Sequence, residues 1–314
     1  MKRIMWTFTK MQGNGNDFVV LDGMSQPIDM TAERARALAD RRFGIGADQV
    51  LLVEAPSHPE ADFRYRIFNA DGSEVEHCGN GARCFVRFVH EHGLSRRNPL
   101  RAEIATGLIT LYESESGDVT VDMGQTRHGP EAAGFDTASL ESSTAGVDTV
   151  WHLPTPGGSV ARLSLVGISN PHAVQVVDDI EQAPVEDAGR YIESHERFAQ
   201  RVNAGFLEVI DRHTIRLRVY ERGAGETLAC GTGACAAVVA GIRRGLLDSP
   251  VCVHTRGGPL EISWEAEQLR MTGPAATVFH GSVDINELVR RQRARSSPFL
   301  PRGSIPHDSP DPDA

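Results

Sequence analysis

The sequence has no long apolar run and no excess of positive charge. No stretch approaches the roughly 18 consecutive apolar residues of a membrane-spanning helix, and residues 1–10 lack the hydrophobic region and cleavage site of a secretory signal. We therefore expect a cytoplasmic protein without a membrane partner. Acidic side chains outnumber basic ones, 42 to 32, for a formal net charge of −10. Because a nucleic-acid-binding face normally concentrates lysine and arginine, this balance argues against nucleic acid as a partner.

Cysteine is also scarce, with five residues in 314. A chain of this length can bury one or two cores without covalent cross-links, so we expect reduced thiols and no disulfide framework. Two pairs of cysteines lie near each other in the sequence, 78/84 and 230/235. The spacing within each pair is longer than that usual for zinc ligands, and no paired histidines accompany them, so we expect no bound metal. Cys84, Cys235 and Cys252 stand in apolar segments, which is typical of buried packing residues.

Two short runs that resemble each other organise the chain. One places Cys78 before the turn Gly79–Asn80–Gly81, and the other places Cys230 before Gly231–Thr232–Gly233. An apolar segment with helical character follows each turn. Each cysteine is therefore expected near the N-terminus of a helix.

The resemblance between the two runs extends upstream. Residues 67–78 align with residues 219–230 without a gap, which indicates an internal repeat spanning half of the chain. Gly93 and Gly245 follow the two helical segments and are candidate helix stops. Two related halves are expected, with a site between them.

The order of the expected strands and helices agrees with two domains. The N-terminal half covers residues 1–127 and is completed by a last strand at about 277–288, and the C-terminal half covers residues 128–276. Residues 127–149 have the composition of a linker or loop insertion. The tail, residues 289–314, is rich in proline and serine and is expected to be largely disordered.

The positions of the two cysteines suggest their chemistry. The N-terminus of a helix carries unsatisfied N–H groups and the positive end of the helix dipole, which lower the pKa of a thiol and bind anions. Two thiols on opposite faces of one carbon can act as base and acid, which is what inversion of a stereocentre requires. The N–H groups of the two turns would then hold a carboxylate and stabilise the enolate-like charge that develops when the α-proton leaves.

Other interpretations of these residues stay open at this point. Residues 231–236 fit the glycine pattern of dinucleotide-binding loops, but that pattern should directly follow a strand, and about ten residues intervene here. A non-catalytic binding protein would give no reason for paired thiols. Taken alone, Glu221 and Arg222 are typical of a solvated surface pair, and His172 of a structural histidine. No lysine stands in a context typical of pyridoxal phosphate enzymes.

Residues 69–83 resemble the signature of the diaminopimelate epimerase family. Four further segments are similar to that family, and together they extend the resemblance over about residues 6–288: 8–18, 42–49, 169–172 and 221–233. The resemblance implies an α/β fold of two pseudo-symmetric domains, each a mostly antiparallel, mixed sheet wrapped around a central helix. It also implies cofactor-independent conversion of LL-2,6-diaminopimelate to the meso isomer, in lysine and peptidoglycan precursor biosynthesis. A homodimer is compatible with it.

The resemblance implies roles for the matched positions. Cys78 and Cys230 would be the acid/base pair. The reacting carboxylate would be held by Gly79, Asn80, Gly231 and Thr232. The rest of the pocket would be lined by Asn16, Gln49, Asn69, Asn170, Asn203, Glu221 and Arg222, with His172 beside the reacting centre. No metal ligand and no cofactor are implied.

The adjacent charges of Glu221 and Arg222 fit the distal ammonium and carboxylate of such a substrate. The nearest rival is a related racemase or epimerase that acts on proline or hydroxyproline by the same two-thiol chemistry. Those substrates lack the distal amino-acid group, so the charged pair and the asparagines argue against them.

Overall fold

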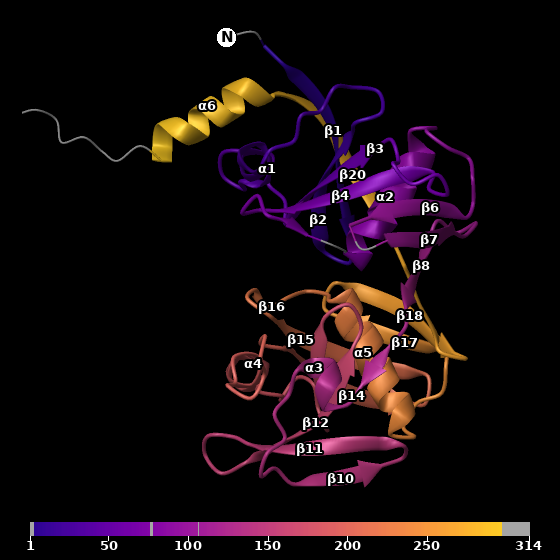
Figure 1. The fold of residues 1–314 in the computed structure, drawn as a ribbon, viewed down its shortest axis with the longest axis vertical. Coiled ribbons are helices and arrows are strands. Elements are labelled where there is room, and N and C mark those ends of the chain that lie inside the picture. The colour runs from indigo at the N-terminus through magenta and orange to yellow at the C-terminus, as the bar shows by residue number, and fades with distance from the viewer. Residues whose placement is uncertain (1–2, 76–77, 106, 297–314) are drawn as a thin grey trace, which may run out of the picture.

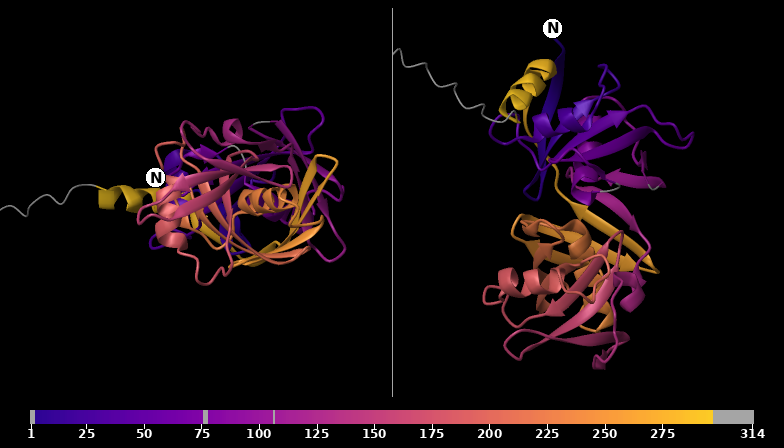
Figure 2. Two further views of the ribbon diagram at one scale, coloured as in Figure 1. Left: turned by 90° about the horizontal axis from the view of Figure 1, so that it is seen from below. Right: turned by 60° about the vertical axis from the view of Figure 1, so that its left-hand side comes forward.

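The fold is described from a computed structural model, which covers residues 3–75, 78–105 and 107–296. The predicted disorder of the tail concerns residues 297–314 for the most part, and these lie outside the described residues. Figure 1 shows two halves stacked along the long axis, and the right-hand view of Figure 2 shows the same division.

The first half repeats the element order of the second. Its elements are β1 (Met5–Gly13), β2 (Asn16–Asp22), α1 (Ala32–Ala39), β3 (Gln49–Glu54), β4 (Phe63–Asn69), β5 (Glu74–Val75), α2 (Gly79–Glu91), β6 (Leu100–Ile104), β7 (Gly107–Glu113) and β8 (Val119–Gly124). Their counterparts are β12 (Val160–Gly167), β13 (Pro171–Val176), α4 (Val185–Glu193), β14 (Asn203–Asp211), β15 (Thr214–Glu221), β16 (Gly225–Glu226), α5 (Gly231–Arg243), β17 (Val251–Thr255), β18 (Gly258–Glu265) and β19 (Gln268–Gly273).

The strand pairing repeats as well. β2 pairs with β3, and β13 with β14, in parallel. β4 pairs with β6, and β15 with β17, also in parallel, whereas the hairpins between them are antiparallel. The internal repeat seen in the sequence is therefore a repeat of topology, and the predicted fold class is confirmed.

Two strands connect the halves. β8 of the first half pairs antiparallel with β19 of the second. β20 (Ala276–Asp284) then returns to the first half and pairs with β1 from Met5↔Asp284 to Gln12↔Ala276 (Figure 1). α6 (Ile285–Ser296) follows and packs against α1, so the chain remains helical beyond residue 289, where the tail was expected to begin.

Residues 127–149 have more structure than their composition predicted. They contain β9 (Arg127–His128), α3 (Pro130–Ala133) and β10 (Ser142–Ala145), and β11 (Asp148–Pro154) begins within them. β10 and β11 form a hairpin that extends the sheet beyond β12. β10 is the outer strand and consists of small, largely exposed residues, whereas β11 lies between β10 and β12 and buries Val150 and Leu153.

α2 and α5 lie at the centres of the two halves. Residues 81–86 of α2 and residues 233–240 of α5 are all buried, as expected for helices that strands surround. Gly93 and Gly245 follow these helices with φ of 67° and 74°, which confirms the two predicted stops. Among the described residues, no helix is both long enough and apolar enough to cross a membrane.

Candidate active site

The N-termini of α2 and α5 open into one cleft. Its volume is about 1210 Å³, and both cysteine turns line it. Met271 of β19 packs between the two turns. A Cβ atom added to Gly79 would lie 2.6 Å from Met271 Cε, and one added to Gly231 would lie 2.9 Å from Met271 Sδ. The two helix N-termini therefore approach the same side chain, which only glycine allows at both positions.

Each cysteine is the N-cap of its helix. Cys78 and Cys230 have extended backbones, with φ of −144° and −119°. Cys78 Sγ accepts a hydrogen bond from the Gly81 N–H at 3.5 Å, and Cys230 Sγ accepts one from the Gly233 N–H at 3.4 Å. A thiol takes the place of the oxygen that usually caps a helix. The predicted position of both cysteines at helix N-termini is confirmed.

The predicted lowering of the thiol pKa values is wrong. Burial raises the pKa of Cys78, and the N–H groups of Gly81 and Asn80 oppose it only in part. Burial also raises the pKa of Cys230 well above its ordinary value, and the nearby charge of Glu221 adds to the effect. Desolvation outweighs the helix N-terminus at both sites, so both cysteines are thiols at neutral pH in this structure.

Glu221 ends β15 and lies against the second thiol. It interacts with Cys230 and accepts a hydrogen bond from Thr227 Oγ1, and burial raises the pKa of its carboxyl group. The sequence assigned this side chain to the distal end of a substrate. Its interaction with Cys230 instead places it beside one of the two cysteine thiols.

Asn16 and Asn80 accompany the first thiol. Asn16 Oδ1 lies 3.7 Å from Cys78 Sγ and accepts a hydrogen bond from Asn80 Nδ2 at 3.4 Å. Gln49 and Asn69 are direct partners on β3 and β4, and Gln49 Nε2 donates to Asn69 Oδ1 at 2.9 Å. These amides line the cleft together with Asn170, Arg222 and Thr232.

His172 and Asn203 are buried and contact the residues of the cleft wall. His172 Nε2 and Asn170 Oδ1 are 2.8 Å apart, and burial, helped by the charge of Arg222, lowers the pKa of His172 to about 3. Asn203 accepts a hydrogen bond from the Arg222 N–H at 2.8 Å and donates to Pro171 O at 3.2 Å. The structure thus places a neutral histidine and a backbone-fixing amide behind the asparagine and arginine that reach the cleft.

The sequence interpretation missed Arg83 and Asp48. Arg83 on α2 is fully buried, and it donates to Asn14 Oδ1 at 2.6 Å and to Pro274 O at 3.1 Å. Its charge lowers the pKa of Cys78. Asp48 accepts hydrogen bonds from Asn16 and Arg41. Both residues lie inside the segments that resemble the family. The sequence of those segments, however, does not show that Arg83 is buried or that Asp48 contacts a residue of the cleft.

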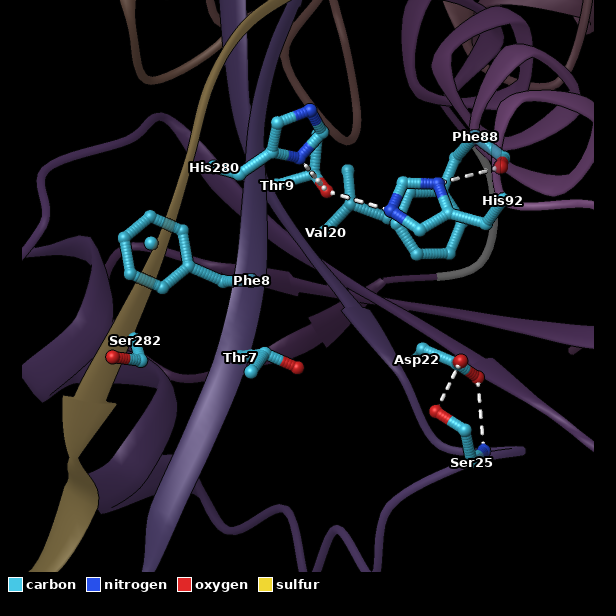
Figure 3. Close-up of a pocket in the computed structure, with 11 residues that line it drawn as sticks. Thr7, Phe8, Thr9, Val20, Asp22, Ser25, Phe88, His92, His280 and Ser282 are labelled. Carbon is cyan, nitrogen blue, oxygen red and sulfur yellow. Dashed lines mark hydrogen bonds between the residues drawn. The ribbon is translucent and has the colours of Figure 1, made fainter.

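A smaller pocket, of about 490 Å³, lies at the other end of α2 (Figure 3). Cys78 caps the start of this helix and His92 caps its end. Thr9 Oγ1 lies between His92 Nε2, at 3.3 Å, and His280 Nδ1, at 3.1 Å. This pocket shares no lining residue with the cleft.

The chain is similar to known proteins along most of its length. The family model described as diaminopimelate epimerase matches residues 8–129 and 164–278. A diaminopimelate epimerase of Cupriavidus taiwanensis is 61% identical over 283 residues, which are 90% of this chain and 98% of the relative. One of Paraburkholderia xenovorans is 60% identical over 282 residues, 88% of this chain and 98% of the relative.

Solved structures with lower sequence identity share the fold. A phenazine biosynthesis protein of the PhzF family from Bacillus anthracis has a TM-score of 0.63 at 15% identity and covers 90% of this chain and 99% of its own. A probable proline racemase from Agrobacterium radiobacter has a TM-score of 0.63 at 17% identity and covers 88% and 92%. A hydroxyproline epimerase from Agrobacterium vitis has a TM-score of 0.61 at 15% identity and covers 90% and 94%. These structures support the fold alone, whereas the matched family model and the 61% identity decide the family: the chain belongs to the diaminopimelate epimerase family.

Proposed function

We propose that this protein interconverts LL- and meso-2,6-diaminopimelate with two cysteines and without a cofactor: one cysteine removes the α-proton, and the other adds a proton to the opposite face of the same carbon. The observation that carries the proposal is the placement of Cys78 and Cys230 as N-caps of two helices that open into one cleft. The high identity to curated diaminopimelate epimerases supports the choice of substrate.

The chemistry needs one thiolate and one thiol. One sulfur takes the α-proton, and the S–H of the other gives a proton to the opposite face of the same carbon, so the stereocentre inverts without a net change in charge. The N–H groups of Gly79, Asn80, Gly231 and Thr232 hold the substrate carboxylate and stabilise the negative charge that develops on it, since those of Gly81 and Gly233 donate to the two sulfurs.

Glu221 can generate the thiolate of Cys230 by accepting its proton. Its carboxylate interacts with Cys230, and burial raises the pKa of both groups. Proton transfer from Cys230 to Glu221 therefore moves a proton between two groups that share one desolvated site. The products of this transfer are a thiolate at Cys230 and a neutral carboxyl group at Glu221, and the Cys78 thiol is then the acid. That turnover leaves a thiol at Cys230 and a thiolate at Cys78, which is the base of the reverse reaction.

Arg222 and the cleft amides select the distal end of the substrate. Arg222 is fixed through its backbone by Asn203, and its Nη1 donates to Gln200 O at 3.0 Å. A guanidinium held in this way can grip a carboxylate with two parallel hydrogen bonds. Gln49, Asn69 and Asn170 then offer amide oxygens to the distal ammonium group.

Incubation in D₂O tests the proposal. Purified protein is given LL-diaminopimelate without added pyridoxal phosphate, and L-proline is given in a parallel reaction. We expect meso-diaminopimelate with one deuterium at the inverted α-carbon, and unchanged proline. Inversion of proline would favour the rival racemase, and retention of the α-hydrogen during epimerisation would contradict a two-base mechanism.

We also propose that the protein is a cytoplasmic homodimer. Each chain has two domains: one comprises residues 1–127 with about 277–288, and the other comprises residues 128–276.

The exposed edge of β20 is the proposed dimer surface. β20 pairs with β1 on one side, and its Val278 and Phe279 are 57% and 46% exposed. A second copy would cover this apolar edge. Sedimentation velocity should give a dimer, and a dimer that persists after Phe279→Asp would contradict this surface.

A further inference from the structure

Asn16 lies between the thiol of Cys78 and the carboxylate of Asp48. Its Nδ2 is 2.9 Å from Asp48 Oδ2, and its Oδ1 is 3.7 Å from Cys78 Sγ. An ionised carboxylate only accepts hydrogen bonds, so the NH₂ end of the amide faces Asp48. The carbonyl oxygen of Asn16 therefore faces the thiol and accepts its S–H.

Asp48 lies at the cleft with its side chain 44% exposed, and several neighbouring groups hold it in place. Its Oδ2 also accepts from the Asp17 N–H at 3.0 Å, and its Oδ1 accepts from Arg41 Nη2 at 2.7 Å. The Asp48 N–H donates in turn to Asp17 Oδ1 at 2.8 Å. Lys10 Nζ lies 2.6 Å from Asp17 Oδ2. Two cations and two backbone N–H groups therefore fix the pair of carboxylates, and Asp48 cannot turn to follow a displaced Asn16.

We propose that Asp48 is a positioning residue for the first of the two thiols: it fixes the Asn16 amide so that its carbonyl oxygen, and not its NH₂ group, meets Cys78. An oxygen acceptor favours the protonated thiol, whereas an NH₂ donor would favour the thiolate. Asp48 thereby favours the protonated form of Cys78, the form that donates when Cys230 is the base. The catalytic consequence rests on the proposed function, but the effect on the thiol does not.

The surroundings of Cys78 show why the amide matters. Arg83 and Cys84 on α2, Tyr65 on β4 and Glu221 on β15 are close enough to interact electrostatically with this thiol. Arg83 and the N–H groups of the turn favour the thiolate, and Glu221 opposes it. The carbonyl oxygen of Asn16, like Glu221, favours the protonated thiol. The orientation of the Asn16 amide therefore affects the pKa of Cys78, on which groups of opposite effect already act.

A double-mutant cycle tests the proposal by the pH dependence of iodoacetamide alkylation. Cys78 and Cys230 are followed in the same sample by peptide mapping, in the wild type, Asp48→Asn, Asn16→Ala and the double variant. In Asp48→Asn the Asn16 amide loses its charged acceptor and keeps only the long hydrogen bond from Asn80 Nδ2 to hold its orientation, so we expect the midpoint for Cys78 to fall by roughly one pH unit. The charge of Asp48 also reaches Glu221, so a smaller fall is expected for Cys230.

The Asn16→Ala background separates the two effects. With the amide absent, Asp48→Asn should move Cys78 no more than it moves Cys230. An undiminished shift of Cys78 in this background would overturn the proposal, as would equal shifts of both thiols when Asn16 is present. Asp248→Asn is the matched control, because Asp248 is half exposed and is also paired with an arginine, Arg212, by a hydrogen bond of 2.7 Å. It should move neither midpoint.

Turnover provides the second arm. Asp48→Asn should lower the rate of LL-diaminopimelate epimerisation roughly tenfold in the wild-type background, mainly in kcat, and add little to Asn16→Ala. Additive losses would overturn the proposal. A wild-type protein that does not epimerise diaminopimelate would contradict the proposed function only, because the alkylation arm needs no substrate.

Discussion

The two cysteine turns have the same backbone and different neighbours. Cys78 and Cys230 cap helices of equal length, and each accepts one N–H from its own turn. Cys78, however, meets the amide oxygen of Asn16, whereas Cys230 meets the carboxylate of Glu221 and the hydroxyl of Thr232, at 3.6 Å. A duplicated scaffold thus presents two thiols in the same way and surrounds them with unlike groups.

The difference can be located in the repeat. Glu221 and Arg222 of the second half align with Asn69 and Ala70 of the first. One half therefore supplies an ionisable pair where the other supplies an amide and a methyl group. Symmetric placement suits inversion, which needs one sulfur on each face, and the asymmetric neighbours suit the assignment of one thiol as base and the other as acid.

The largest effect is expected from removing one of the two thiols, which tests whether both turns take part in the reaction. Cys78→Ser and Cys230→Ser should each lower epimerisation on the order of 10³-fold, because each face needs its own proton carrier and a hydroxyl is a far weaker acid. Cys252→Ser is the control, since Cys252 lies on β17 and not in the cleft. Near-normal turnover in either of the first two variants would contradict the two-thiol model.

The second prediction concerns the asymmetry itself. Glu221→Gln should lower turnover roughly 10²-fold, because an amide cannot accept the Cys230 proton. The same change removes a charge that raises the pKa of both thiols, so both should alkylate at lower pH, with the larger shift at Cys230. A larger shift at Cys78 would show that Glu221 does not belong to the second thiol.

A smaller effect is expected at the neighbouring arginine. Arg222→Lys should raise KM roughly tenfold and change kcat less, because an ammonium group keeps the charge but cannot form two parallel hydrogen bonds to the distal carboxylate. Steady-state kinetics with LL-diaminopimelate measure both constants. An unchanged KM would mean that Arg222 does not bind the substrate.

The last prediction concerns stability and not activity. His172 has a pKa of about 3 in the folded protein and an ordinary value of 6.5. Below pH 6.5 the unfolded chain binds a proton that the folded chain does not, so the free energy of unfolding falls by about 1.4 kcal/mol per pH unit until the pH nears 3. The contribution is complete above pH 6.5.

Urea unfolding of the wild type and of His172→Asn at pH 7.5 and pH 5 measures this term. The wild type should lose more stability than the variant between the two pH values. Equal losses would show that His172 is not buried as a neutral ring. In the repeat its place is taken by Phe18, which cannot titrate, so the effect belongs to the second half alone.

Local patterns in the chain predicted much of this molecule. The cysteine turns predicted two helix N-termini, and Gly93 and Gly245 predicted where those helices end, because capping and left-handed backbone conformations depend on a few adjacent residues. The gapless alignment of residues 67–78 with 219–230 predicted two similar halves. The expectation for residues 127–149 failed because the β10–β11 hairpin is held by its pairing with β12, a contact distant from its own composition.

The sequence by itself determined the repeat, the two helix-capping thiols and the family, since each of these features depends on short runs of adjacent residues. Only the tertiary structure decided the protonation of the thiols and the roles of their neighbours. Helix position alone favours thiolates, but burial is set by the whole fold, and it reversed the pKa shift of both cysteines. Likewise Asp48, in the loop before β3, reaches Asn16, and Glu221, at the end of β15, reaches Cys230. Such contacts depend on how distant segments pack and not on neighbouring residues in the sequence.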